Sequence, residues 1–249
     1  MKIYLGFDDT DSLDSEYGTG KVARWFSSEL PAGCRMWGVV RQQLLVDDAI
    51  PYTSHNSSAC LIIESSRNGD LLRELAERAE KHLGRHAAAG SDPGLCIAAE
   101  NAPGLAGLME FGLACTHRVV TQDDARRACT GIHLTGHGGS NDGIIGAAAA
   151  VGLTAAGWYG RFIEFGHLRR LPAELRVDEL EEHGIRIMAM DRDALVPKPG
   201  DRVLTQNWVR PRLLGGEPVL PVAQQAPGVW ETMGGRRGRK NGGHTSAGP

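Results

Sequence analysis

The sequence has few features that would place the protein in a membrane or in an oxidising compartment. Its five cysteines are an odd, widely spaced set without a CxxC pair, so a disulfide framework is not expected. The apolar run from Met1 to Gly6 is too short for a signal peptide, and no later run reaches the roughly 18 apolar residues of a membrane span. We therefore expect a cytoplasmic protein with ordinary buried thiols and no membrane partner.

Several familiar catalytic motifs are also missing. The sequence contains no GxSxG nucleophile elbow, and His82 and His86, although spaced to share a helical face, have no third ligand and are interpreted as surface histidines. A P-loop is excluded because Ser15 stands where its first glycine would be and Val22 where its Ser or Thr would be. The marks of a serine hydrolase, a zinc protease and a P-loop NTPase are thus absent.

The formal net charge of -3 is unevenly distributed. Residues 234–249 contain four basic side chains and no acidic one, so the rest of the chain has a net charge of -7. Sequence-independent binding of nucleic acid depends on Lys and Arg side chains that displace counterions from phosphates. The charge therefore argues against nucleic acid as the principal partner unless one face is locally basic, and any weak RNA contact is expected through the basic tail, at Arg236, Arg237, Arg239 and Lys240.

Hydrophobic periodicity predicts an α/β fold with a mixed sheet, packed helices and a small β-rich carboxyl-terminal subdomain. Strands are expected at residues 2–7, 35–45, 58–64 and 95–99. Helices are expected at residues 21–30, 68–86, 142–157 and 171–183, and another begins at Thr121. Residues 142–157 consist almost entirely of Ala, Ile, Val, Leu and Gly, which indicates a tightly buried helix.

The texture of the sequence divides the chain into three parts. Residues 1–165 are expected to form a nucleotide-binding α/β domain, and residues 166–230 a smaller extension in which Pro and Gly punctuate short apolar runs. Residues 231–249 are rich in Gly and Arg and predict a disordered basic tail. We expect that residues 234–249 can be deleted with a melting temperature unchanged within a few degrees. The sequence gives no indication of the oligomeric state.

Three carboxylates follow the first expected strand directly, in the segment Asp8-Asp9-Thr10-Asp11. Side chains at the carboxyl end of a strand commonly meet ligands in α/β folds. Carboxylates this close together repel one another, and Mg²⁺, held by carboxylates and phosphate oxygens, is the natural counter-charge. The segment predicts a metal site at Asp8, Asp9 and Asp11, and the alternative is an exposed acidic turn.

A short loop after these carboxylates, Gly18-Thr19-Gly20-Lys21, combines backbone N–H groups, a hydroxyl and a positive charge. These groups suit a phosphate. Alone, the loop is a weak signal and equally describes an ordinary helix start. Next to the carboxylates, it favours one pocket for metal and phosphate, with the nucleotide in contact with Thr10, Gly18, Gly20 and Lys21.

Two further loops supply candidate ligand contacts. A second glycine-rich loop precedes the expected buried helix, and either it contacts the nucleotide or its glycines serve close packing; the candidate residues are Gly138, Gly139, Ser140 and Asn141. A polar loop after Tyr52 and a turn before the fourth expected strand are candidate substrate contacts, although a loop that satisfies its own hydrogen bonds is an equal alternative. The candidates there are Thr53, Ser54, His55, Asn56 and Asp92.

Four segments taken together resemble the amino-terminal half of the archaeal tRNA(Ile) 2-agmatinylcytidine synthetases. They are Gly6-Phe7-Asp8-Asp9-Thr10-Asp11-Ser12, Ala49-Ile50-Pro51-Tyr52 with its polar loop, Asp92-Pro93-Gly94-Leu95, and the small-residue run from Gly139 to Ala150. Their order and rough spacing also agree with the family. The resemblance covers residues 1–165, thins toward residue 220 and is absent from the tail.

In that family a kinase-like domain uses ATP and Mg²⁺ to phosphorylate a cytidine of the anticodon, after which agmatine displaces the phosphate. A threonine at the start of the first helix is itself phosphorylated. The resemblance implies that Asp8, Asp9 and Asp11 hold metal and nucleotide and that Thr19 is that threonine. The synthetases also carry an OB module and a zinc ribbon, which are not seen in this sequence.

We therefore expect a shortened paralogue that keeps the ATP- and Mg-dependent chemistry of a transferase or ligase. Its acceptor is expected to be a nucleoside-like small molecule or a tRNA. The alternative is a nucleotide-binding regulatory module without catalysis.

Overall fold

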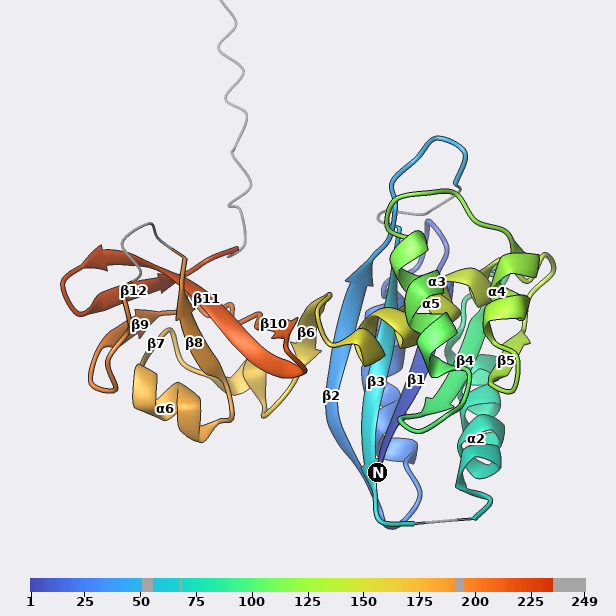
Figure 1. The fold of residues 1–249 in the computed structure, drawn as a ribbon, viewed down its shortest axis with the longest axis horizontal. Coiled ribbons are helices and arrows are strands. Elements are labelled where there is room, and N and C mark those ends of the chain that lie inside the picture. The colour runs from blue at the N-terminus through green and yellow to red at the C-terminus, as the bar shows by residue number, and fades with distance from the viewer. Residues whose placement is uncertain (51–55, 68, 191–194, 235–249) are drawn as a thin grey trace, which may run out of the picture.

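The computed structural model of the chain describes residues 1–50, 56–67, 69–190 and 195–234. It has two lobes, a larger one in which helices flank a sheet and a smaller β-rich one (Figure 1). The lobes join at β6 (Arg161–Glu164), which pairs with β2 (Cys34–Gln43) on one side and with β10 (Arg212–Leu214) on the other. This confirms the predicted α/β class with a mixed sheet and a small β-rich carboxyl-terminal subdomain.

The larger lobe is built on an antiparallel sheet in the order β5-β4-β1-β3-β2. Besides β2, its strands are β1 (Lys2–Asp8), β3 (Ser57–Ser65), β4 (Gly94–Ala99) and β5 (His133–Gly136). β1 lies between β3 and β4, and Ile3, Leu5 and Phe7 are fully buried on one of its faces. The prediction of an interior strand at residues 2–7 is confirmed.

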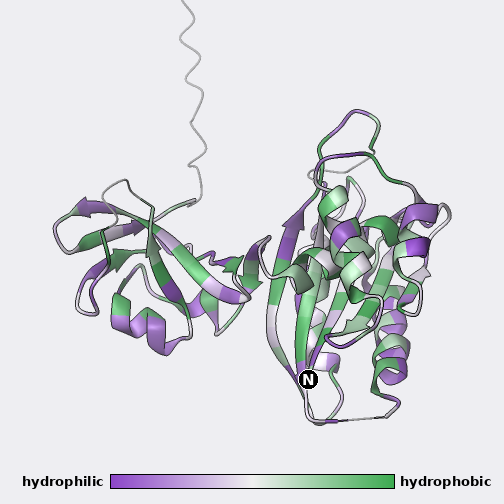
Figure 2. Cartoon of the chain, in the orientation of Figure 1, coloured by the Kyte–Doolittle hydropathy of each residue, from purple (hydrophilic) through white to green (hydrophobic). Residues whose placement is uncertain are grey.

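Helices cover both faces of this sheet. One face carries α1 (Thr19–Trp25), the 3-10 turn η1 (Phe26–Glu29) and α2 (Leu71–His86). The other carries α3 (Leu105–Ala114), α4 (Gln122–Ala128) and α5 (Gly143–Ala156). Figure 2 shows hydrophobic residues along the central strands and α5, and hydrophilic ones along the outer side of α2. α4 begins as expected at Thr121, whose side chain caps the helix, whereas α3 and β5 were not predicted.

Helix α5 lies so close to its neighbours that side chains have no room at the contacts. A Cβ atom at Gly6 of β1 would overlap the Ala147 carbonyl oxygen, and one at Gly152 would overlap the Leu108 carbonyl oxygen of α3. Eleven of the helix residues are buried, and Gly157 ends it in the left-handed conformation (φ 77°) that favours glycine. The predicted buried helix at residues 142–157 is confirmed.

This close packing gives a test with a matched control. Gly152→Ala is expected to lower the free energy of unfolding by about 1–3 kcal/mol, because the added methyl group forces α3 and α5 apart. Gly107 in α3 is the control, since no described atom lies within 4 Å of its added Cβ. Gly107→Ala is expected to raise the stability by up to about 1 kcal/mol through helix propensity. Urea denaturation measures both changes, and equal stabilities would contradict the close contact.

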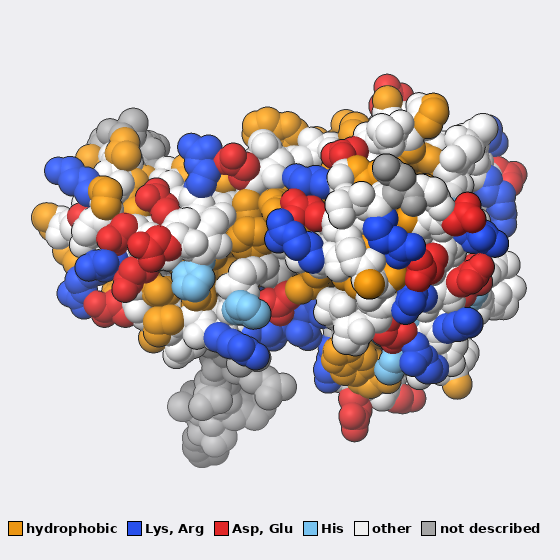
Figure 3. All heavy atoms as spheres, turned by 90° about the horizontal axis from the view of Figure 1, so that it is seen from below, with side chains coloured by type: hydrophobic (Ala, Val, Ile, Leu, Met, Phe, Trp, Pro, Cys, Tyr) orange, Lys and Arg blue, Asp and Glu red, His pale blue; other side chains and the backbone are white. Residues whose placement is uncertain are grey.

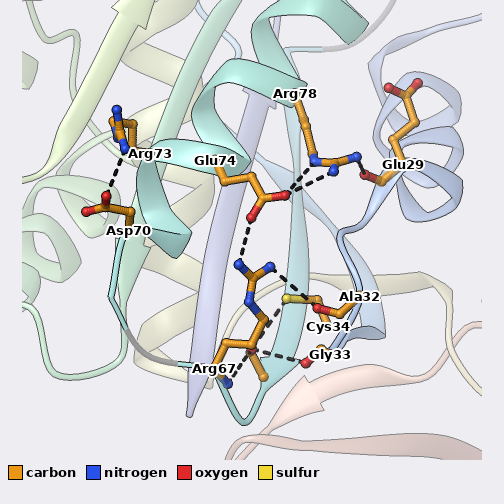
Figure 4. Close-up of polar contacts among 10 residues, drawn as sticks. Glu29, Ala32, Gly33, Cys34, Arg67, Asp70, Arg73, Glu74 and Arg78 are labelled. Atoms are coloured by element: carbon orange, nitrogen blue, oxygen red, sulfur yellow. Dashed lines mark hydrogen bonds and ion pairs between the residues drawn. The ribbon is translucent and has the colours of Figure 1, made fainter.

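Ion pairs tie the outer face of α2 to the turn that leads into β2. Figure 4 shows Glu74 between Arg67 and Arg78, at 2.9 and 3.0 Å from their NH2 atoms. Arg78 also donates to the Glu29 carbonyl oxygen and Arg67 to that of Ala32. Exposed ion pairs contribute little to stability. The network therefore fixes the position of the helix end more than it adds to the stability of the fold.

His82 on the inner face of α2 is fully buried. Its Nδ1 lies 2.6 Å from the Glu29 carboxylate and its Nε2 lies 2.9 Å from the Val22 carbonyl oxygen. The interpretation of His82 as a surface histidine is wrong, because the helix face that carries it packs against α1. His86 is half-buried and lies against Trp25 at a ring-centroid distance of 5.3 Å.

The smaller lobe contains the 3-10 turn η2 (Leu168–Arg170), α6 (Val177–Glu182) and six strands besides β6. The strands are β7 (Glu174–Arg176), β8 (Arg186–Ala189), β9 (Arg202–Leu204), β10, β11 (Glu217–Ala226) and β12 (Val229–Thr232). The expected helix at 171–183 is wrong in its first half, because residues 174–176 pair with β9 and pairing outweighs helix propensity there.

Strand β12 includes Glu231 and Thr232, the first two residues of the predicted tail. β12 pairs with β11 and β9, and Trp230 and Thr232 are buried in the lobe. Residues 235–249 lie outside the described residues. Among the described residues, no helix combines the length and the apolar character that a membrane crossing needs.

Candidate active site

A cavity of about 560 Å³ lies at the carboxyl end of β1 and the amino end of α5. Because β1 runs antiparallel to β3 and β4, the end of β1 meets the beginnings of both neighbours at this edge of the sheet. Six residues predicted from the sequence, drawn from four separate segments, line the cavity together: Asp8, Asp9, Asp11, Thr19, Asn56 and Asp92.

Asp8 lies at the floor of the cavity against the first turn of α5. A Cβ atom at Gly146 would overlap the Asp8 carboxylate, so only glycine at this position lets the carboxylate approach the helix backbone. Burial, and then the charges of Asp9 and Asp11, raise the pKa of Asp8 well above its usual value of 3.8. A cation in the cavity would relieve both effects.

Asp9 adopts a left-handed backbone conformation (φ 49°), which is uncommon outside glycine. Burial raises its pKa, followed by the charges of Asp92 and Asp11 and, more weakly, that of Asp142. Residues held in sparsely populated backbone conformations cluster at functional sites. The turn at Asp9 thus adds a second carboxylate next to Asp8. Five carboxylates from three parts of the chain line the cavity: Asp8, Asp9, Asp11, Asp92 and Asp142.

The raised pKa of Asp8 predicts a pH dependence of stability. The folded carboxyl group holds its proton to a higher pH than the unfolded one does, so its contribution lowers stability as the pH rises from about 4 toward the raised native pKa. Asp8→Asn removes this effect. In EDTA, the melting temperature of Asp8→Asn minus that of the parent is expected to increase as the pH rises through this window. Asp14→Asn, at an exposed position of the same loop, is the control and should show no such increase.

Thr19 is held by hydrogen bonds at the wall of the cavity. Its hydroxyl donates to Asp11 Oδ1 at 3.1 Å and accepts from the Thr10 hydroxyl at 3.1 Å and from the Thr10 backbone N–H at 3.3 Å. The Thr19 backbone N–H donates to the same Asp11 oxygen at 3.1 Å. A hydroxyl whose proton points at a carboxylate is arranged for nucleophilic attack with that carboxylate as general base.

The second glycine-rich loop holds Asp92 and does not line the cavity. The Ser140 backbone N–H and hydroxyl donate to the Asp92 carboxylate at 2.9 and 2.5 Å and lower the pKa of Asp92. A Cβ atom at Gly138 would overlap that carboxylate, and one at Gly139 would lie 3.9 Å from it. Asn141 has a left-handed backbone (φ 64°) at the turn into α5. These four residues therefore position Asp92, whereas their predicted contact with a nucleotide stays a prediction.

Other predicted residues lie apart from this cavity. Thr10 is buried, and its connection to the cavity is the hydrogen bond that its hydroxyl donates to Thr19. Gly18 lies beside the Asp11 carboxylate. Gly20 and Lys21 line a separate, smaller cavity. The candidates Thr53, Ser54 and His55 lie outside the described residues.

Sequence reasoning missed several residues of the cavity wall. Asp142 adds the fifth carboxylate and accepts a hydrogen bond from Gln122 at 2.6 Å. Within the described residues, Arg118 is the one Lys or Arg among those that line the cavity. The signal for Asp142 was an acid at the first position of the helix expected at residues 142–157, but nothing in the sequence connected Arg118 with the carboxylates. Apolar walls come from Leu44, Val119, Val120 and Ile145.

The carboxylates of the cavity are chemically suited to a hard divalent cation, whereas the described group of possible ligands whose atoms lie within 4.8 Å of one another is Glu29, His82 and His86, on the other face of the sheet. Carboxylate oxygens are the ligands that Mg²⁺ prefers, and Asp8, Asp9 and Asp11 lie close enough for their charges to act on one another. A cation there would leave coordination positions for phosphate oxygens. The apolar walls suit the uncharged part of a ligand.

Comparison with solved structures identifies the fold. A crystal structure of apo TiaS, described as an agmatidine synthetase that acts on an isoleucine tRNA, matches 61% of this chain and 35% of its own with a TM-score of 0.51 and 23% identity. The matched part of this chain shares the fold of about a third of TiaS. A tRNA fluorescent labeling enzyme matches with a TM-score of 0.51 and 24% identity, over 61% of this chain and 36% of that one. A complex of TiaS with its tRNA and ATP matches over the same shares, with a TM-score of 0.51 and 23% identity.

The match to TiaS confirms the predicted resemblance at the level of the fold. This chain spans about a third of the length of the matched TiaS chains. No protein-family model and no curated protein matches it.

Proposed function

We propose that the protein catalyses ATP- and Mg²⁺-dependent phosphoryl transfer through Thr19. The observation that carries this proposal is the Thr19 hydroxyl, which donates to Asp11 at 3.1 Å in the wall of a cavity with five carboxylates. A mere acidic turn would not enclose a hydroxyl paired with a general base. The fold shared with a protein solved in complex with tRNA and ATP supports the same function.

In the proposed step the Thr19 oxygen attacks the γ-phosphorus of ATP. A bond forms between them, the bond from that phosphorus to the bridging oxygen of ADP breaks, and the Thr19 proton passes to Asp11. Asp8, Asp9 and Asp11 would hold Mg²⁺, whose charge would neutralise the phosphate oxygens. Arg118 offers a positive charge at the same wall. Thr10 fixes the Thr19 oxygen by donating two hydrogen bonds to it.

The acceptor that finally takes the phosphoryl group is proposed to be a tRNA or a nucleoside-like molecule. The support is the fold of TiaS, a protein solved in complex with its tRNA, an ATP analogue and agmatine. Part of the cavity wall is apolar, which suits a base or another planar group.

The proposal is tested by incubating the protein with ATP labelled at the γ-phosphate, in Mg²⁺ or in EDTA. Label on a peptide that contains Thr19, formed only in Mg²⁺, is the expected result. Labelling should fall when total tRNA is added if tRNA is the acceptor. ATP that binds without being consumed would contradict the proposal and favour the regulatory nucleotide-binding module.

A further inference from the structure

A second, smaller cavity of about 260 Å³ adjoins the carboxylate cavity. The two cavities share Asp11, Thr19 and Ser57 in their linings, so Thr19 borders both. The two cavities have opposite character. Where the first gathers carboxylates, the second is lined by four basic side chains from α1, β2 and η2: Lys21, Arg24, Arg41 and Arg169.

The basic side chains have little acidic compensation. Within the described residues, no ion pair involves Lys21, Arg24 or Arg41, and the closest approach of Arg169 to an acid is 3.7 Å, to Glu164. This contrasts with arginines on the outer surface of the chain, several of which pair with carboxylates at 3.0 Å or less.

Two of the guanidinium groups are also partly buried. The pKa of Arg41 is lowered by burial and by the neighbouring charge of Arg161. The pKa of Arg24 is lowered by burial and by Arg169, and the charge of Glu164 offsets part of this shift. A partly buried charge without a partner destabilises the folded state. An anion bound in this cavity would offset that cost.

Lys21, an exposed side chain that lines this cavity, also contacts two aromatic rings. Its Nζ lies 5.2 Å from the ring centre of Tyr17 and 5.0 Å from that of Trp25, within the range of cation–π attraction. The lining of the cavity thus combines guanidinium groups from α1, β2 and η2 with one lysine ammonium group.

We propose that this basic cavity is a subsite for a phosphate group of the acceptor, separate from the carboxylate cavity that takes the nucleotide. The inference rests on the proposed function, since it places the phosphate-bearing acceptor and the phosphoryl donor in the two cavities that Thr19 borders. Arginine forks match the oxygen pairs of a phosphate, and several cations suit a group with more than one negative charge. An acceptor that carries a carboxylate has a single negative charge and would need fewer basic side chains.

The subsite adjoins a larger hollow of about 640 Å³, lined by residues of α1, β2 and the segment that follows β6. Arg24 and Arg169 line both cavities, and the hollow adds Trp25, Trp37 and Arg35. Figure 3 shows Lys and Arg side chains near the narrow junction between the lobes on the face seen from below. The ligand therefore has room to continue beyond its phosphate, over aromatic and basic side chains.

Pyrophosphate in EDTA is the first probe, because the carboxylate cavity repels anions when no metal is present. The parent is expected to bind it, and Arg24→Gln and Arg41→Gln are each expected to bind at least about tenfold more weakly. Arg126→Gln, which removes an equal charge from the surface of α4, should bind as the parent does. Neither cavity variant should melt below the parent without ligand. No binding by the parent, or equal affinity in all three variants, overturns the proposal.

Short single-stranded oligoribonucleotides, with and without a 5′-phosphate, then identify the source of the phosphate. Competition with pyrophosphate by the phosphorylated form alone identifies a terminal monoester, and competition by both forms identifies the phosphodiester backbone. Competition by neither overturns the assignment to an acceptor. Asp9→Asn separates this proposal from the proposed function, since it should lose Mg-ATP binding but keep pyrophosphate binding in EDTA.

Discussion

Thr19→Ala is expected to lower the rate of phosphoryl transfer from ATP by at least about a thousandfold while leaving Mg-ATP binding nearly unchanged. The substitution removes the oxygen that forms the new bond to phosphorus, but none of the five carboxylates that line the cavity. Single-turnover transfer and isothermal titration of ATP in Mg²⁺ measure the two quantities separately. A loss of transfer without a loss of binding is the signature of a missing nucleophile.

Thr19→Ser is the matched control, because it keeps the hydroxyl and its hydrogen bond to Asp11. It should retain transfer within about tenfold of the parent, with the loss arising from a less restricted side-chain rotamer. Thermal melts check that Thr19→Ala folds, since the Thr10 hydroxyl loses its acceptor in that variant. If Thr19→Ala transferred phosphate at the parent rate, the acceptor would have to attack ATP directly and Thr19 would only position Asp11.

The carboxylates and Thr19 could be found in the sequence because they lie close together along the chain. One strand end and one helix start carry Asp8, Asp9, Asp11 and Thr19, so local pattern and residue chemistry suffice to group them. Asp142 and Arg118 reach the cavity only through tertiary packing, the first at the start of α5 and the second after α3. The helix α3 itself is apolar on nearly every side and has no polar face that would reveal a helical period.

The basic cavity could not be predicted for a different reason. Its side chains are separated by long stretches of sequence, at Lys21, Arg24, Arg41 and Arg169, and the acidic net charge of the chain outside the tail hides them. Net charge averages over the whole surface, whereas binding depends on the local field. A locally basic region is thus present in the cavity that Thr19 borders, while the predicted RNA contact through residues 236–240 stays a prediction.

The glycine-rich loop before α5 shows how one pattern can serve two purposes. The sequence is compatible with two roles for this loop, contact with a ligand or close packing. The structure shows a third, because Gly138 and Ser140 contact the Asp92 carboxylate. The loop contributes to the cavity by holding a carboxylate at its edge. Sequence could indicate that the loop mattered but not which group it surrounds, because Asp92 lies 48 residues away.

Asp9→Asn and Asp11→Asn are each expected to weaken Mg²⁺-dependent ATP binding by at least about tenfold, or 1.4 kcal/mol, without destabilising the protein. Asparagine keeps nearly the same shape but removes one negative charge, so it relieves repulsion within the carboxylate group while it weakens the metal site. At position 9 it also tolerates the left-handed backbone that Asp9 adopts. The melting temperature should therefore stay at the parent value or rise slightly.

Asp123→Asn supplies the control for this pair, because the Asp123 side chain is 80% exposed on α4, away from the cavity. It removes the same charge and should change neither binding nor stability. Titrations of ATP with and without Mg²⁺ should show metal and nucleotide binding cooperatively in the parent and in Asp123→Asn, but not in the other two variants. A purely structural role for these carboxylates predicts the reverse, with stability lost first and binding merely following it. If Asp9→Asn and Asp11→Asn melted normally and bound Mg-ATP as the parent does, the assignment of a metal site to this cavity would be wrong. The proposal of an enzyme would then lose its main support.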